Sequence, residues 1–211
     1  MTTHHHGHDH DHPHPTRPDR DGPVTYHQRL ETAIRELLIA KGILTAEEIR
    51  RAVEAMDARS PALGARIIAR AWSDPAYKQR LLSEGGKAVS ELGIEAGAYR
   101  LIVVENTERV HNLVVCTLCS CYPRAILGLP PDWYKSRAYR SRAVREPRAV
   151  LAEFGTRIAD DIEVRVHDST ADMRYLVLPK RPKGTDDWPE ARLAEIVSRD
   201  AMIGVCEPQI G

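Results

Sequence analysis

Three cysteines lie within six residues, at Cys116, Cys119 and Cys121, directly after the apolar run 113–115. Cysteines that form a disulfide need Cα atoms about 4.4–6.8 Å apart, and a trio this tight meets that requirement only with strain. Structural zinc sites usually take two separated pairs of ligands, and here only one compact group is present. The cluster therefore predicts a metal-binding loop, and the apolar run before it predicts a strand of a rigid sheet on which the loop rests.

The covalent spacing of the loop allows planar coordination. A metal bound to the sulfurs of Cys119 and Cys121 can also bind the backbone nitrogens of Ser120 and Cys121, which closes chelate rings of five, five and six atoms. Cys116 then approaches from one axial side and leaves the opposite side open for water or substrate. Amide nitrogens bind only after deprotonation, which a small trivalent ion such as cobalt(III) or iron(III) achieves and zinc rarely does. These four residues are the predicted metal ligands.

Longer motifs around the loop resemble the α subunit of nitrile hydratase. They occupy residues 115–123, 127–135, 139–142, 144–147, 150–155, 174–179 and 199–204. The resemblance is strong from residue 100 to residue 205 and looser from residue 25 to residue 99. In that family Thr at the second position of the loop accompanies cobalt and Ser accompanies iron. Thr117 therefore implies one cobalt(III) per chain, with iron(III) as the alternative.

The resemblance also implies a reaction and a modified site. The family hydrates nitriles to amides as a lyase, and its second and third loop cysteines are oxidised. Carried over, Cys119 becomes a sulfinic acid and Cys121 a sulfenic acid, both catalytic candidates, while Cys116 stays a thiolate. Low-pKa thiolates on a metal are where such oxidation begins. A β subunit is implied as partner, in a heterodimer or α2β2 heterotetramer, and supplies arginines to the oxidised sulfurs. An activator protein that inserts cobalt and a small nitrile substrate complete the implied partners.

Two other functions stay open. The metal subunit of thiocyanate hydrolase has the same loop, and that enzyme converts thiocyanate into carbonyl sulfide and ammonia. Arg124 favours it, because many nitrile hydratases carry Trp at this place and an arginine suits a small anion. Gly97 is a second departure, since iron-type relatives have Gln there. The alternative from another class is a non-enzymatic zinc module that binds through the three cysteines with His111 or Cys206.

Composition excludes other classes of function. The chain has 211 residues, with 30 basic and 30 acidic side chains, and its formal net charge is zero. This balance gives no reason to expect nucleic acid or a membrane surface as partner. No apolar run approaches the roughly 18 residues that span a bilayer, and the N-terminus lacks the apolar stretch of a secretory signal. Free thiols favour a reducing compartment, so the predicted location is the cytoplasm.

The expected fold is α+β, with an N-terminal helical arm before a compact, layered α/β domain that carries the metal loop. Residues 1–22 hold seven histidines and are expected to be disordered, either as a solvated tail or as a handler of cobalt. Residues 23–97 show helical periodicity and narrow apolar stripes, which predicts an arm that wraps a partner. Residues 98–211 form the metal-binding domain.

Local signals place the elements. Gly42 is a helix C-cap, 45–48 is a capping box, and Asp74 followed by Pro75 begins another helix. Short β-branched runs predict strands at 99–104, 113–115, 162–167 and 175–178. Helices are expected over 137–154, broken near Pro147, and over 189–200 after the cap at 186–187.

Several other side chains could act in catalysis or metal binding but also have a structural interpretation. Cys206 is predicted to be an inert thiol, and His111 and His167 are predicted to be structural histidines. Arg174 and Tyr175 either orient the site or pack beside it. A series of arginines is either a solvated helix face or a set of ion-pair partners for an anionic metal site: Arg124, Arg137, Arg140, Arg142, Arg145 and Arg148.

Overall fold

The computed structural model describes residues 23–210, which divide into two compact units between Arg50 and Arg51. The His-rich segment 1–22, predicted to be disordered, lies outside the described residues. No described helix combines the length and the apolar character that a membrane span requires.

The first unit contains α1 (Tyr26–Ala40) and the start of α2 (Ala46–Asp57). The predicted capping box is confirmed, because Thr45 accepts from the backbone of Glu48 and the Glu48 carboxylate accepts from the backbone of Thr45. Gly42 ends the first helical segment with φ of 65°. Neither helix has a buried residue, so their apolar side chains face solvent.

The second unit, from Arg51 onward, holds the strands β1 (Arg100–Glu105), β2 (Val110–Val115), β3 (Glu163–Asp168) and β4 (Met173–Leu178). Its helices are α3 (Pro61–Ser73), α4 (Pro75–Ser83), α5 (Gly85–Ser90), α6 (Arg124–Leu127), α7 (Asp132–Lys135), α8 (Arg137–Arg145), α9 (Pro147–Glu153), α10 (Glu190–Glu195) and α11 (Arg199–Ile203). The mixture of helices and strands confirms the predicted α+β class.

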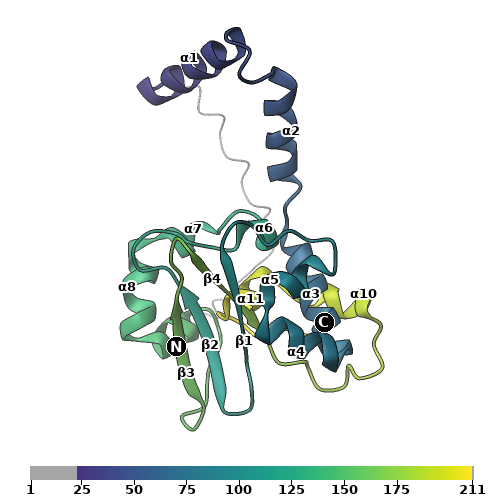
Figure 1. The fold of residues 1–211 in the computed structure, drawn as a ribbon. Helices are drawn as coiled ribbons and strands as arrows, with labels where there is room; N and C mark the ends of the chain where they lie inside the picture. Colours follow the sequence, from purple (N-terminus) through teal and green to yellow (C-terminus); the bar gives the residue numbers. More distant parts are fainter. Residues whose placement is uncertain (1–22, 211) are drawn as a thin grey trace, which may run out of the picture. The chain divides into compact units, whose positions relative to one another are not determined.

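The strands form two parallel pairs, β1 with β4 and β2 with β3 (Figure 1). Val115, the last residue of β2, is in register with Asp168, the last residue of β3. Parallel strands end at the same edge, so whatever follows β2 lies beside the end of β3. This edge carries the cysteine loop.

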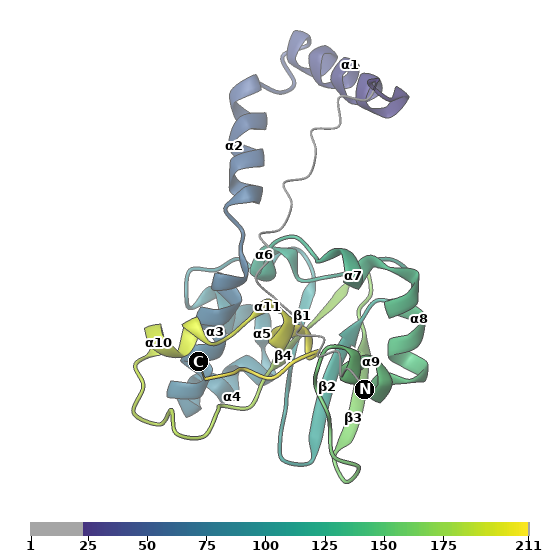
Figure 2. The ribbon, with the colours of Figure 1, turned by 180° about the vertical axis from the view of Figure 1, so that it is seen from behind.

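Helices cover the two pairs on different sides (Figures 1 and 2). α4 and α5 contact β1, whereas α8 contacts β2 and α9 contacts β3. α3 packs on α10 and buries Ile67 and Ile68 in the core that it shares with Leu113 and Leu176. α3 to α5 pack on the strands and on α10, so they belong to the same compact unit as the strands. The boundary between the two units therefore lies near residue 50 and not near residue 97. The partner-wrapping role of 23–97 stays a prediction.

Two local predictions need correction. The helix expected over 189–200 is two helices, α10 and α11, with Pro189 and Ser198 as their N-caps, so the acidic pair at 186–187 caps neither. β2 begins three residues before the expected strand, because His111 and Asn112 lie inside it and are buried. The prediction placed the start of this strand too late because it relied on apolar runs, and the first half of β2 contains polar residues. The break at Pro147 is confirmed by α8 and α9.

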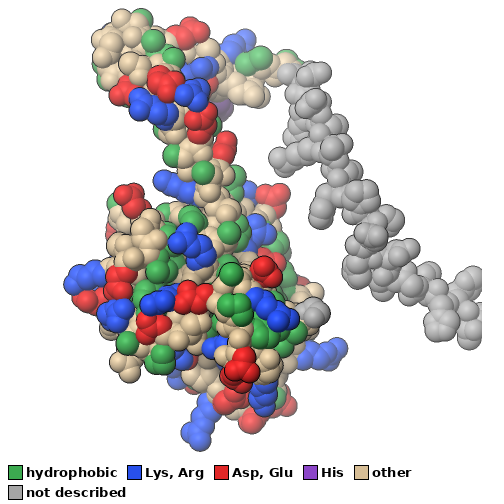
Figure 3. All heavy atoms as spheres, turned by 90° about the vertical axis from the view of Figure 1, so that its right-hand side faces the viewer, with side chains coloured by type: hydrophobic (Ala, Val, Ile, Leu, Met, Phe, Trp, Pro, Cys, Tyr) green, Lys and Arg blue, Asp and Glu red, His purple; other side chains and the backbone are tan. Residues whose placement is uncertain are grey.

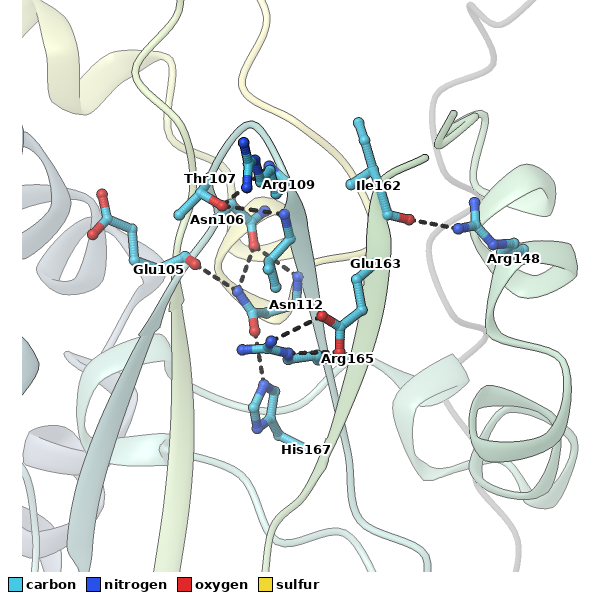
Figure 4. A network of polar contacts seen from close by, with 11 residues as sticks. Glu105, Asn106, Thr107, Arg109, Asn112, Arg148, Ile162, Glu163, Arg165 and His167 are labelled. Carbon is cyan, nitrogen blue, oxygen red and sulfur yellow. Dashed lines mark hydrogen bonds and ion pairs between the residues drawn. The ribbon is translucent and has the colours of Figure 1, made fainter. Parts of the chain in front are cut away.

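Asn112 belongs to a hydrogen-bond network that includes Asn106 and His167 (Figure 4), and His111 also contacts Asn106. Asn112 donates to the Glu105 carbonyl at 2.8 Å, and its side-chain oxygen lies 2.8 Å from His167 Nε2. His111 contacts Asn106 through Nδ1 and the Gly204 carbonyl through Nε2 at 2.8 Å. Burial lowers the pKa of both histidines, so the fold favours their neutral forms. The predicted structural role of His111 and His167 agrees with these contacts.

The free energy of unfolding is therefore expected to fall as the pH is lowered from 7 to 5.5. Unfolded histidine takes up a proton near pH 6.5, whereas the folded histidines resist it, so the unfolded state binds more protons in this window. Each histidine contributes a slope of up to about 1.4 kcal/mol per pH unit. Urea titrations at several pH values should show that the free energy of unfolding depends less steeply on pH in His111→Gln than in the wild type. The same pH dependence in the variant and the wild type would contradict this account.

Candidate metal centre

The cysteine loop starts at the end of β2 and brings three sulfurs together. Cys116 is buried at 1% exposure, Cys119 is exposed, and Cys121 is half-buried. The Sγ atoms of Cys116 and Cys119 are 3.4 Å apart, and those of Cys119 and Cys121 are 3.2 Å apart. All three lie within 4.8 Å of one another, and among the described residues they form the group that could hold a metal ion.

These separations test what kind of ion fits. With metal–sulfur bonds of about 2.3 Å, right angles at the metal put neighbouring sulfurs about 3.3 Å apart, and tetrahedral angles put them about 3.8 Å apart. The two observed distances match right angles. The donor set thus fits a square-planar or octahedral ion better than tetrahedral zinc. His111 and Cys206 do not join the cluster, so the zinc alternative lacks its proposed fourth ligand among the described residues.

Side chains from distant parts of the chain fix the loop. Asp168 accepts from the backbone N–H of Thr117 at 2.9 Å and from its hydroxyl at 2.6 Å. Tyr134 donates to the Cys121 carbonyl at 2.8 Å, and Tyr139 donates to the Val114 carbonyl at 2.6 Å. The loop is thereby tied to β3 and α7, and the end of β2 is tied to α8. Sequence analysis missed Asp168, Tyr134 and Tyr139, although the expected strand at 162–167 lay directly before Asp168.

The thiols differ in their acidity. The pKa of Cys119 is lowered to about 7, because the Cys121 and Cys116 thiols donate hydrogen bonds to the Cys119 sulfur. Burial raises the pKa of Cys121, and a hydrogen bond to Cys119 raises it further, against the opposing charge of Arg174. Cys119 is accordingly the exposed sulfur that most readily becomes a thiolate, which is the form that binds metal and is oxidised.

The candidate arginines have different surroundings. Arg142 pairs with Glu146 and Glu153, and Arg148 donates to backbone carbonyls at 158, 159 and 162. Arg124 is exposed at the start of α6. Arg140 reaches the Thr117 carbonyl at 3.4 Å. Arg174 lies over the Tyr99 ring at 5.1 Å, and its Nε is buried without a partner among the described residues.

Cys206 lies apart from the loop. It contacts the Ser198 hydroxyl at 3.4 Å, and burial raises its pKa, which favours an unreactive thiol. It lines a cavity of about 850 Å³ that contains none of the three loop cysteines. Tyr175 stacks beside His167 at 4.9 Å and so packs in the interior network.

A family profile described as "Nitrile hydratase, alpha chain" matches residues 25–206. The chain belongs to this family. It is 50% identical over 178 residues to the low-molecular weight cobalt-containing nitrile hydratase subunit alpha of Rhodococcus rhodochrous, covering 83% of this chain and 86% of that one. It is 44% identical over 194 residues to the thiocyanate hydrolase subunit gamma of Thiobacillus thioparus, covering 86% and 80%. The predicted resemblance to the family is confirmed.

Solved structures agree on the fold. A recombinant thiocyanate hydrolase with partially modified cobalt centres has a TM-score of 0.82 and 43% identity, covering 89% of this chain and 92% of that one. A double mutant of the Fe-type nitrile hydratase from Comamonas testosteroni Ni1 has a TM-score of 0.78 and 43% identity, covering 86% and 89%. Relatives of both metal types and both activities therefore share this architecture.

Asp168→Ala is expected to weaken metal retention without unfolding the protein. The change removes two hydrogen bonds that fix Thr117 between Cys116 and Cys119. Loss of a contact that supports a metal ligand typically lowers metal affinity about 10–100-fold. Dialysis of the cobalt-loaded protein against a chelator, followed by elemental analysis, measures the loss. Asp172→Ala removes an exposed carboxylate from the β3–β4 turn and serves as the matched control. Equal retention in the two variants would show that Asp168 does not support the site.

Proposed function

We propose that this chain is the metal-carrying α subunit of a cobalt nitrile hydratase, which adds water to R–C≡N to give R–C(=O)NH₂. The observation that carries the proposal is the right-angled spacing of three sulfurs in a chain 50% identical to a cobalt-containing relative. Thr117 in the second loop position supports cobalt(III) over iron(III). A reducing compartment, the cytoplasm, suits the free thiols of the unmodified loop.

The sulfurs of Cys116, Cys119 and Cys121 and the backbone nitrogens of Ser120 and Cys121 would hold the metal. Cys116 is the buried one of the three thiols. Cobalt, when bound, supplies Lewis-acid polarisation of the nitrile or of the attacking water. With Cys119 as sulfinic and Cys121 as sulfenic acid, the deprotonated oxygen on Cys121 would take a proton from the attacking water. As the alternative nucleophile it would add to the nitrile carbon, and water would then cleave that adduct to release the amide and restore the sulfenic acid.

The proposal includes partner polypeptides. A β subunit, in a heterodimer or heterotetramer, covers apolar stripes on α1 and α2 and supplies arginines to the oxygens on Cys119 and Cys121. Leu30, Ile34 and Leu37 of α1 are 42%, 49% and 54% exposed, which supports such a cover. An activator protein delivers cobalt to the loop before the partner closes over it.

Thiocyanate hydrolysis is the second candidate, and Arg124 favours it. This exposed guanidinium follows the loop directly, at the start of α6, where it can attract a small anion. The 44% identical thiocyanate hydrolase subunit gamma and the 0.82 TM-score of a thiocyanate hydrolase structure keep this activity in contention. The product would be carbonyl sulfide with ammonia.

One preparation tests both activities and the metal. The chain is co-expressed with its partner polypeptide and activator in cobalt-supplemented medium, and the purified complex is assayed with acetonitrile and with thiocyanate. We expect one cobalt per chain and amide formation at least about tenfold faster than carbonyl sulfide release, which corresponds to about 1.4 kcal/mol in transition-state stabilisation. Faster carbonyl sulfide release would establish the second candidate. Stoichiometric zinc without cobalt would refute both.

A further inference from the structure

A basic groove lies beside the cysteine loop. Its volume is about 530 Å³, and it is lined by Thr117, Arg137, Arg140, Ser141, Val144 and Arg145. Five of these residues belong to α8, and Thr117 is part of the loop itself. The lining contains three guanidinium groups and no carboxylate. On the face drawn in Figure 3, by contrast, basic and acidic side chains are interspersed.

The groove arginines lack the partners that their neighbour has. Arg142, on the same helix, forms ion pairs with Glu146 and Glu153. Within residues 23–210, no ion pair is formed by Arg137, Arg140 or Arg145. The Nε of Arg140 is buried without a hydrogen-bond partner, and its Nη1 makes only a long contact of 3.4 Å to the Thr117 carbonyl. Unsatisfied buried donors of this kind indicate a missing acceptor.

The arrangement also opposes the local preferences of a helix. Arg137 is the first residue of α8, where the helix dipole disfavours a positive charge, and Arg140 stands three positions later on the same face. A sequence that keeps such conflicts commonly does so at a functional surface. The groove therefore suits an anion that neutralises these arginines.

The spacing selects the kind of anion. The backbone positions of Arg137 and Arg145 are about 12 Å apart along the axis of α8, so a ligand with several anionic groups can pair with both arginines without drawing their side chains together. A chain that carries several carboxylates matches this spacing, and Val144, 50% exposed between the arginines, offers it an apolar contact. The net charge of zero does not favour nucleic acid as the polyanion.

We propose that the basic groove binds an acidic segment of the partner subunit, with carboxylates paired to Arg137, Arg140 and Arg145. This inference rests on the proposed function, because it assigns a docking point to the partner named there. Arg140 joins the groove to the loop through the Thr117 carbonyl, so the docked segment lies directly beside the ligating cysteines. The groove thereby fixes the position of the partner relative to the metal loop.

The test measures assembly of the full chain with its co-expressed partner. Arg137→Gln/Arg145→Gln removes two exposed charges of the groove. The control Arg100→Gln/Arg109→Gln removes two exposed arginines, one at the start of β1 and one in the connection between β1 and β2. At 50 mM salt we expect the groove variant to raise the dissociation constant at least about tenfold and the control variant to change it less than about twofold. Raising the salt to 300 mM should weaken the wild-type complex more than the groove variant.

The outcomes separate this inference from the proposed function. Equal dissociation constants for groove and control variants, in a complex that still hydrates nitriles, would refute the groove alone. Absence of any complex would refute both. Titration with inorganic phosphate provides the remaining arm. Saturable phosphate binding to the groove that is unchanged when the partner is bound would make the groove a site for free anions and overturn the proposal. Binding of a duplex oligonucleotide that is lost in the groove variant would also overturn it.

Discussion

Replacing Cys116, Cys119 or Cys121 by Ser is expected to abolish hydration activity and to lower the apparent cobalt affinity by more than about 100-fold. Hydroxyl oxygen is a poor substitute for thiolate toward this class of ion, and loss of a ligand exceeds the 10–100-fold effect of losing a supporting contact. The sulfurs lie 3.4 Å and 3.2 Å apart, which is close enough for one ion to bind all three. Each substitution would therefore remove a ligand from the same ion. Elemental analysis and amide formation, both on the complex with its partner, measure the two effects.

Cys206→Ser provides the matched control for the loop substitutions. Cys206 contacts Ser198 and not the three loop cysteines, so the same chemical change there should leave metal content and turnover within about twofold of wild type. Loss of turnover in this variant at unchanged cobalt content would show that the site extends to Cys206.

The chain purified without its partner is expected to self-associate and to hydrate nitriles at less than about 1% of the rate of the complex. Obligate interfaces commonly bury about 2,000 Å² or more, and about 25 cal/mol of stabilisation accompanies each Å² of apolar surface removed from water. The exposed apolar side chains of α1 and α2 would be covered by such an interface, and the proposed β subunit would add arginines to the oxidised sulfurs on Cys119 and Cys121. Light scattering and amide assays on the cobalt-loaded chain test both halves.

Surface substitution supplies the control for that experiment. Leu30→Ser/Leu37→Ser should improve the solubility of the isolated chain and weaken its complex, because both residues are exposed on α1. A monomeric, cobalt-loaded wild-type chain with full turnover would show that neither the stripe nor the metal loop depends on a partner.

Much of the fold and the site could be predicted from local chemistry. The Thr45 capping box, the Asp74 cap before Pro75 and the break at Pro147 each rest on hydrogen bonds or steric limits that act within four residues. The three cysteines were found for the same reason, since chelate rings depend on covalent spacing alone. Thr117 and its neighbours then carried the resemblance to the family.

What escaped prediction depends on residues far apart in the sequence. Asp168 supports Thr117 only because β2 and β3 pair in parallel, across 51 positions of the chain. α3 belongs to the strand-bearing unit because its apolar side packs against α10, a helix more than a hundred residues later in the sequence. The basic groove was also hidden, because the sequence shows a run of arginines but not that Arg142 alone among the four of α8 has carboxylates beside it.

The pairing of Val115 with Asp168 also determines the order in which the cysteine loop and its supporting strand form during biosynthesis. The cysteines leave the ribosome well before β3, so during synthesis the loop exists without the strand and the carboxylate that fix it. A non-local contact of this kind forms only after the intervening chain is complete and its loop entropy has been overcome. Metal insertion at a shaped loop would then follow folding of the second unit, and a metal ion that arrives earlier would meet three thiols that the fold does not yet hold in place.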